Sequence, residues 1–106
     1  MDELDPVIHV QARLRIVTIL DALGVGDSLS FPRLQALLGT TSGNLATHLR
    51  KLEDSGYAIV EKVLEGRNPV TYVSLTDDGR LAFRVYKKNL RALLDGATTS
   101  DIRSTS

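Results

Sequence analysis

The chain has 106 residues, 42% of them hydrophobic, which is enough for one compact domain with a single core. It has no cysteine and two histidines, His9 and His48, so disulfides and thiolate metal sites are excluded and no metal site is predicted. Its 13 basic and 13 acidic side chains cancel, and no apolar run is long enough to span a bilayer. We therefore expect a cytoplasmic protein without a cofactor.

The first predicted helix runs from about Asp5 or Pro6 to Leu23, because proline is tolerated in a first turn and Gly24 follows the last apolar residue. Its apolar side chains form two stripes. One stripe consists of Ile8, Ala12, Ile16, Ile19, Leu20 and Leu23, and the second of Val10, Leu14 and Val17. Two stripes imply two neighbours, so we expect the second stripe to contact a partner subunit. Burial of both stripes within one subunit is the alternative.

A helix, a tight turn and a second helix are predicted next. Phe31 is expected to form a very short strand before a helix over residues 32–38, which ends at Gly39. The following helix is capped by Thr41, whose hydroxyl can accept an amide of the first turn, and it ends before Gly56, a residue suited to the left-handed conformation. This is the helix-turn-helix arrangement.

The helix over residues 42–55 has two different faces. At 100° per residue, Leu45, Leu49 and Leu52 fall on one side. The other side is small, polar or basic and contains Ser42, Gly43, Asn44, Thr47, Arg50 and Lys51, with His48 at the border. Such a face is typical of a recognition helix, whose N-terminal residues read bases in the major groove.

Each polar residue of this helix has a role that it could fill on DNA. Asn44 can pair with an adenine edge, and Thr47 can meet a base or a thymine methyl. Ser42 and the helix N-terminus can hold a phosphate. Arg50, Lys51 and His48 are candidate phosphate ligands. The alternative is that all of them are ordinary solvated side chains.

Two runs rich in β-branched residues, 57–65 and 70–75, flank the turn formers Gly66-Arg67-Asn68-Pro69. They predict a hairpin with a four-residue tip, and the buried face of its first strand is left open. A hairpin after a recognition helix is the wing of a winged-helix domain. Arg67 at the tip could enter a minor groove, or it could be a solubilising turn residue.

A last helix is predicted from Thr76, its cap, to about Leu94. One stripe, formed by Ala82, Phe83, Tyr86, Leu90 and Leu93, needs a cover, which we expect a second subunit to supply. Packing within one chain is the alternative. Leu81 and Val85 are expected to dock on the domain instead. Residues 96–106 are polar and expected to form a flexible tail, so the domain covers residues 1–95.

The order of these elements and the strings RLRIVTIL, FPRLQALL, GNLATHLRKLEDSGY and VSLTDDGR resemble the compact winged-helix transcriptional regulators related to the MarR and ArsR families. The resemblance implies an α+β, mainly α-helical, winged helix-turn-helix fold. It also implies a homodimeric regulator, often a repressor, that binds double-stranded DNA. An enzyme is not expected, because the sequence has no glycine-rich phosphate loop, paired metal-ligand motif or nucleophile signature. By position, the DNA-contacting residues are Ser42, Asn44, Thr47, His48 and Arg50 on the recognition helix, and Arg67 on the wing.

Two features depart from these families, and one rival function stands beside DNA binding. Many ArsR-like proteins sense metals through cysteines, which this chain lacks, so metal sensing is not carried over. Many MarR-like proteins have additional helices that frame a ligand pocket, so the existence of a small-molecule effector stays open. The rival is a winged-helix module that binds another protein, for which a net charge of zero is no handicap.

Overall fold

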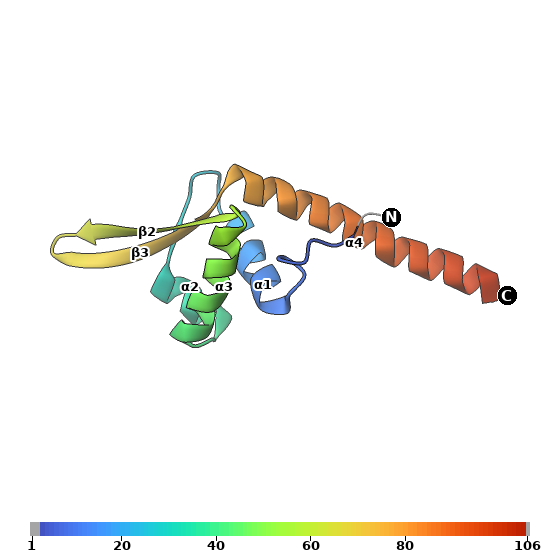
Figure 1. Ribbon diagram of the computed structural model, residues 1–106, viewed down its shortest axis with the longest axis horizontal. Coiled ribbons are helices and arrows are strands. Elements are labelled where there is room, and N and C mark those ends of the chain that lie inside the picture. Colours follow the sequence, from blue (N-terminus) through green and yellow to red (C-terminus); the bar gives the residue numbers. More distant parts are fainter. Residues whose placement is uncertain (1–2, 106) are drawn as a thin grey trace.

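Four helices and a three-stranded antiparallel sheet make up the computed structural model, which describes residues 3–105 (Figure 1). The elements in chain order are α1 (Gln11–Asp21), β1 (Leu29–Ser30), α2 (Phe31–Leu38), α3 (Ser42–Asp54), β2 (Ala58–Glu65), β3 (Asn68–Leu75) and α4 (Asp77–Thr105). In the sheet, β3 lies between β1 and β2. This mainly helical α+β arrangement, with a hairpin after the third helix, confirms the predicted winged helix-turn-helix fold.

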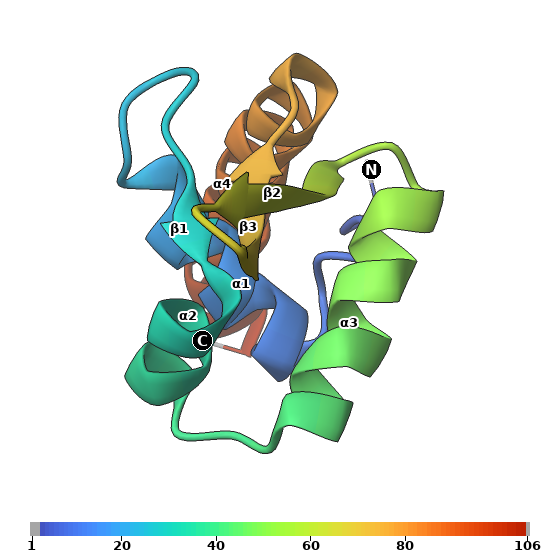
Figure 2. The same ribbon diagram turned by 90° about the vertical axis from the view of Figure 1, so that its left-hand side faces the viewer.

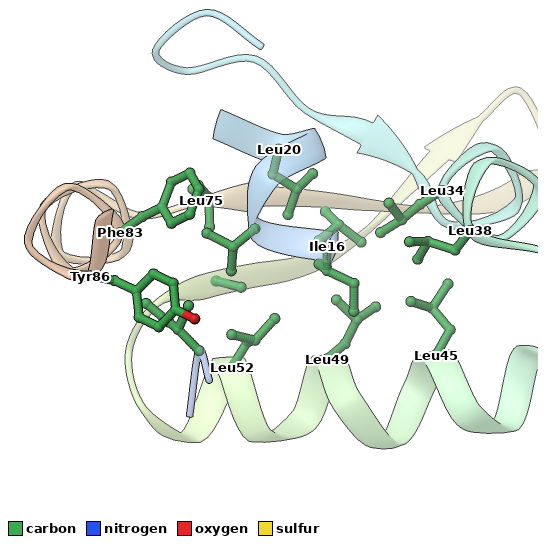
Figure 3. Packing of buried hydrophobic residues seen from close by; sticks show 14 residues of the cluster. Ile16, Leu20, Leu34, Leu38, Leu45, Leu49, Leu52, Leu75, Phe83 and Tyr86 are labelled. Atoms are coloured by element: carbon green, nitrogen blue, oxygen red, sulfur yellow. The ribbon is translucent and has the colours of Figure 1, made fainter. Parts of the chain in front are cut away.

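One hydrophobic core joins the helices to the sheet (Figure 3). From α3, Leu45, Leu49 and Leu52 enter it with 2% exposure or less, as their spacing predicted. The side chains that meet them come from α1, α2 and β3 and include Ile16, Val17, Leu20, Leu34, Leu38, Val73 and Leu75. Burial of one leucine contributes about 1.5–3 kcal/mol. Three buried leucines therefore fix the rotation of α3 and leave its opposite face to solvent.

The first helix begins at Gln11, and its predicted start at Asp5 or Pro6 is wrong. Val10 is extended, with φ −132° and ψ 126°. The preceding segment is instead closed by Asp5, whose Oδ1 accepts the amides two and three residues further on at 2.8 and 3.3 Å. Its Oδ2 accepts the hydroxyl of Tyr57 at 2.5 Å. Because this partner is remote in sequence, the hydrophobic period of the helix could not indicate the turn.

Local capping signals set the limits of α2 and α3. The hydroxyl of Ser30 accepts an amide of the first turn of α2 at 3.3 Å, so the helix begins at Phe31 and the short strand lies just before that residue, not at it. Gly39 ends α2 with φ 63°. The Oγ1 of Thr41 accepts the amide of Asn44 at 3.1 Å, which confirms the predicted cap of α3.

The β2–β3 hairpin turns over two residues, Gly66 and Arg67, and the predicted four-residue tip is wrong. Gly66 has φ 63°, and glycine at the first central position is typical of type II′ hairpin turns. Asn68 and Pro69 belong to β3 and pair with the last two residues of β2. Proline is tolerated there because β1 pairs with β3 only further along, which leaves β3 a neighbour on one side at Pro69.

The start of α4 is locked onto the segment that joins α3 to β2. Thr76 caps the helix as predicted, because its Oγ1 accepts the amide of Gly79 at 2.9 Å and also donates to the carbonyl of Gly56 at 2.6 Å. The amide of Thr76 donates to the carbonyl of Tyr57 at 3.1 Å. Gly79 is buried, and a Cβ at this position would lie 2.2 Å from that same carbonyl oxygen.

The last helix continues to Thr105, so its predicted end near Leu94 is wrong, and residues 96–105 of the predicted tail are helical. Gly96 is the only glycine in residues 96–105, which contain no proline, and these two residue types are the ones that strongly disfavour a helix. Glycine costs about 1 kcal/mol relative to alanine, which is too little to end a long helix. Ser106 lies outside the described residues.

The side of α4 that packs on the core is the one that was expected to contact a second subunit, and the side that was expected to dock on the domain is exposed. Phe83 and Tyr86 pack on the core with 5% and 2% exposure, whereas Leu81 and Val85 are 54% and 46% exposed. Val17 of α1 is also fully buried. Val17, Phe83 and Tyr86 are thus covered within one chain, and their assignment to a dimerisation surface is wrong. Both sides of α4 carry apolar residues, and the hydrophobic period does not indicate which side meets the core.

Candidate nucleic-acid interface

The face of α3 opposite its leucines is exposed to solvent. Exposed on it are Ser42, Gly43, Asn44, Thr47, Arg50 and Lys51, while His48 is half-buried at its border. Seen from the hairpin end of the molecule, α3 stands at one outer edge and α2 at the opposite edge, with α1 between them (Figure 2). An α-helix about 10–12 Å across matches a major groove about 12 Å wide, so this helix can enter one.

The first turn of α3 is open and rich in donors. A Cβ added to Gly43 would have no neighbour within 4 Å, so another molecule can approach the backbone closely. The first amides of a helix have no intrahelical acceptor, and Thr41 takes the amide of Asn44. The amides of Ser42 and Gly43 are therefore available to an anion, which the helix dipole also favours.

Thr47 offers a more restricted contact than the sequence suggested. Its Oγ1 donates to the carbonyl of Gly43 at 3.0 Å, one turn earlier in α3. A threonine hydroxyl has one hydrogen to donate. Thr47 therefore retains its methyl group and its oxygen lone pairs for an external partner, and it is a candidate for contact with a thymine methyl.

The cations of the predicted site are exposed and have no neutralising partner among the described side chains. Arg50 and Lys51 lie in the second half of α3, and Arg67 lies at the tip of the hairpin. Both ion pairs found among the described side chains join Asp21 to cations of α4, at 3.3 and 3.9 Å. Segregation of this kind lets a chain of zero net charge keep a locally basic surface.

The hairpin projects from the helical body, with Arg67 at its far end (Figure 1). Lys62 is exposed on β2, but Glu61 and Glu65 are exposed on the same strand. The hydroxyl of Tyr72 donates to the carboxylate of Glu65, and this hydrogen bond raises the pKa of Tyr72. Arg67 is therefore the residue through which the wing presents positive charge farthest from the body.

Arg13 of α1 contacts α3, although nothing in its sequence context marked it. Its Nε donates to the carbonyl of Val7 at 2.5 Å, and its Nη1 lies 3.3 Å from Nδ1 of His48. The imidazole of His48 is therefore in contact with α1 through one ring nitrogen, and its role as a DNA ligand stays a prediction. The two partners of Arg13 lie on separate segments, and no local pattern could have indicated their meeting.

Tyr57 ties the end of α3 to the segment that precedes α1. Its hydroxyl donates to Asp5, and this hydrogen bond, burial and nearby carboxylates raise the pKa of Tyr57 to about 12. The amide of Tyr57 donates to the carbonyl of Leu52 at 2.9 Å. A displacement of the N-terminal segment would therefore also displace Tyr57 and the C-terminal end of α3.

The other residues predicted for subunit contact remain accessible in part. Val10, Leu14 and Leu90 are half-buried, and Leu93 is 38% exposed. The exposed side of α4 near Leu81 and the N-terminal segment form a groove of about 460 Å³. The distal part of α4 extends beyond the helical body (Figure 1), and its Leu93 and Leu94 are 38% and 57% exposed.

The chemistry of the site is that of binding. Among the side chains that the structure describes, no three or more of histidine, aspartate or glutamate gather as a possible metal site. No helix within residues 3–105 has the length and apolar character needed to cross a bilayer. What α3 and the hairpin do present are hydrogen-bond donors, acceptors and positive charge.

A helix-turn-helix followed by a hairpin wing, with a polar and basic face on its second helix, defines a class of DNA-binding proteins. Residues 12–94 match the winged helix DNA-binding domain family, and the chain belongs to this family. The family and fold are those of DNA-binding transcriptional regulators, which are not enzymes. Solved structures assigned to the MarR, ArsR and PadR families share the fold, which confirms the predicted resemblance.

Three relatives illustrate the similarity. An uncharacterized protein of Methanocaldococcus jannaschii is 37% identical over 81 residues, which are 76% of this chain and 84% of that protein. A transcriptional regulator homologue from Pyrococcus horikoshii is 32% identical with a TM-score of 0.78, covering 85% of this chain and 86% of its own. A protein of Enterococcus faecalis assigned to the MarR family is 21% identical with a TM-score of 0.67, covering 94% and 84%, and it is similar in fold alone.

Proposed function

We propose that this protein is a homodimeric transcriptional repressor that binds a specific, roughly palindromic site in double-stranded DNA. In this proposal α3 enters the major groove, and the hairpin contacts the adjacent minor groove or backbone. The observation that carries it is the exposed face of α3, polar at its N-terminus and basic further along, on a helix whose other face is buried. Such a regulator acts where the chromosome is, in the cytoplasm.

Bases are read by Asn44 and Thr47. The exposed amide of Asn44 can form two hydrogen bonds with the N6 and N7 edge of adenine. Thr47 directs its hydroxyl hydrogen to its own helix and meets a thymine methyl with its own methyl group. These two residues lie near the N-terminus of α3, the part of a recognition helix that contacts base edges.

Phosphates are held at both ends of this surface. The free amides at the start of α3 and the hydroxyl of Ser42 bind one phosphate, at the open position that Gly43 provides. Arg50 and Lys51 bind others further along. Arg67 adds a contact from the wing, and its charge favours a narrow minor groove.

Dimerisation is supported by the way in which α4 leaves the body. At 1.5 Å per residue its 29 residues are about 43 Å long, and the whole molecule extends 67 Å. Cover on one side of the helix falls from Phe83 and Tyr86, which are buried, to Leu90, which is half-buried, and Leu93, which is exposed. A helix without packing is marginal in water. A second copy of α4 around a two-fold axis would cover this side.

Two subunits also compensate for the charge balance of the chain. A net charge of zero predicts weak, salt-sensitive binding by one subunit. Linking two recognition helices makes the second contact intramolecular and raises the affinity. Half-sites about one helical turn, ~34 Å, apart would then place both helices on one face of the duplex. The mechanism needs no small-molecule effector, although the groove along α4 leaves room for one.

Selection of bound duplexes from a random pool, followed by sizing of the complex, tests the proposal. We expect enrichment of a two-fold symmetric motif and a complex of two chains per duplex. Affinity should fall steeply with rising salt, in proportion to the phosphates contacted. A pool without enrichment, together with a salt-insensitive or absent affinity, would contradict DNA binding.

One observation favours a second candidate, a winged-helix module that binds another protein. The hairpin exposes apolar side chains, with Val63 at 39%, Leu64 at 71% and Ile59 at 50%. Exposed apolar residues on a projecting hairpin are typical of protein contacts. The same salt titration separates the candidates, because a protein-binding module need show no affinity for a duplex.

A further inference from the structure

The contact between Arg13 and His48 indicates which imidazole nitrogen carries the hydrogen. A guanidinium group donates hydrogen bonds and cannot accept them. Its Nη1 lies 3.3 Å from Nδ1 of His48, so Nδ1 is the acceptor and is unprotonated. In a neutral imidazole the hydrogen then sits on Nε2.

The remaining nitrogen of His48 is open to solvent. Nε2 has no hydrogen-bond partner among the described residues. In that part of the chain, every buried side-chain nitrogen or oxygen has a hydrogen-bond partner, so a nitrogen without one is not buried. Nε2 is therefore accessible. His48 borders the exposed face of α3, between Asn44 and Lys51 along the helix. The ring thus offers one N–H donor at the edge of the proposed DNA surface.

Arg13 is itself anchored, which makes it a suitable support. Its Nε donates to the carbonyl of Val7 at 2.5 Å while its Nη1 faces His48, so one guanidinium bridges the N-terminal segment, α1 and α3. Lysine has a single nitrogen on a flexible stem and cannot reproduce this fork. The nearby Arg15 lines the same cavity of about 170 Å³ as His48, but its Nη1 donates to the carbonyl of Leu38 instead.

We propose that Arg13 is a positioning residue for DNA recognition, which holds His48 as a neutral Nε2–H donor aimed at an acceptor on the duplex. The acceptor is a phosphate oxygen or a base edge such as guanine N7 or thymine O4. This inference rests on the proposed DNA binding. His48 then contributes a directed hydrogen bond, and Arg13 acts through it without touching DNA.

Long-range ¹H–¹⁵N NMR of the free protein tests the arrangement of the ring. The chain has two histidines, His9 and His48, and a His48→Gln variant assigns their signals. We expect His48 to be the Nε2–H tautomer in the wild type and a mixture of tautomers in Arg13→Met. Arg15→Met is the matched control, since it removes a neighbouring arginine that donates to Leu38 and not to the ring, and it should leave the tautomer unchanged.

Fluorescence anisotropy on the duplex selected from the random pool tests the consequence. Loss of one hydrogen bond predicts a roughly two- to tenfold weaker affinity for both Arg13→Met and His48→Gln, with Arg15→Met closer to wild type. Repeating the selection with Arg13→Met distinguishes the acceptors. Relaxed preference at one base pair indicates a base edge, whereas an unchanged motif with uniformly weaker binding indicates a phosphate.

The possible failures can be told apart. A wild-type protein that binds no duplex overturns the proposed function and this inference together. Wild-type affinity in Arg13→Met, or an unaltered His48 tautomer, overturns the inference alone. Arg13→Lys keeps the charge and serves if Arg13→Met does not fold. It should behave like Arg13→Met, and wild-type behaviour would show that charge, not geometry, is what matters.

Discussion

Replacement of Gly79 by alanine should destabilise the protein, even though alanine is the better helix former. The new Cβ would lie 2.2 Å from the carbonyl oxygen of Tyr57 and 3.0 Å from its carbonyl carbon. Ordinary contact begins at 3.4 Å, so the first turn of α4 would have to move away by about 1.2 Å. The obstacle is backbone, and it cannot rotate aside as a flexible side chain would.

Three contributions set the size of the effect. Overpacking of this kind costs about 1–3 kcal/mol. Separation of the two segments also weakens the hydrogen bond from the amide of Thr76 to the carbonyl of Tyr57, which contributes about 1 kcal/mol. The higher helix propensity of alanine stabilises the folded state by about 1 kcal/mol and offsets part of this loss. We expect a net loss of about 1–3 kcal/mol, at roughly 4–8 °C in Tm for each kcal/mol.

Thermal and urea denaturation, followed by circular dichroism, measure this loss. Gly96→Ala is the matched control, because it makes the same change in the same helix where a Cβ would meet nothing within 4 Å. That variant should be as stable as wild type or about 1 kcal/mol more stable. If Gly79→Ala were as stable as Gly96→Ala, α4 would not approach the backbone of Tyr57 as closely as described.

Three further predictions concern DNA, assembly and pH. Asn44→Ala should relax base preference at one position at a cost of about 1–3 kcal/mol, whereas Arg67→Ala should weaken binding to many sequences and flatten its salt dependence, both measured by fluorescence anisotropy. Leu93→Glu should shift the protein from dimer to monomer in light scattering, while Lys88→Glu, the same new side chain on another exposed face, should not. The folded state raises the pKa of Tyr57 from 10.0 to about 12, so stability should fall as pH rises through this window, and Tyr57→Phe should lack this part of the decline.

Each of these predictions has an outcome that contradicts it. Equal, sequence-independent losses from Asn44→Ala and Arg67→Ala would remove Asn44 from base reading. A Leu93→Glu variant that remains dimeric would locate the subunit contact elsewhere than on the distal part of α4. An identical decline in stability above pH 10 for wild type and Tyr57→Phe would show that the raised pKa of this phenol does not arise in the folded state.

The helix α3 could be predicted almost completely, because its signals are local. Thr41 caps it, leucines at helical spacing define its buried side, and the expected range of residues 42–55 differs from Ser42–Asp54 by one position. The polar face follows from the same spacing, since whatever lies opposite three buried leucines is exposed. The candidate residues on α3 therefore came directly from the pattern.

Contacts between residues remote in sequence explain the features that were predicted wrongly or not at all. The start of α1 depends on Asp5, whose carboxylate accepts a hydrogen bond from Tyr57 far along the chain. A turn therefore precedes Gln11, where proline and the apolar period predicted a helix. The hairpin tip depends on pairing of Pro69 with β2, which turn propensity alone argues against. The contact between Arg13 and His48 could not be predicted, because the two residues lie on different helices.

Amino-acid order by itself determined the sequence of elements, the caps and the leucine-backed face of α3, because each follows from residues within a few positions of one another. Which side of α4 is buried was decided only by tertiary structure. That helix carries apolar residues on two sides, and the core accepts Phe83 and Tyr86 while Leu81 and Val85 stay exposed. Helical periodicity reports that a side is apolar, but only packing against a particular neighbour determines which apolar side is covered.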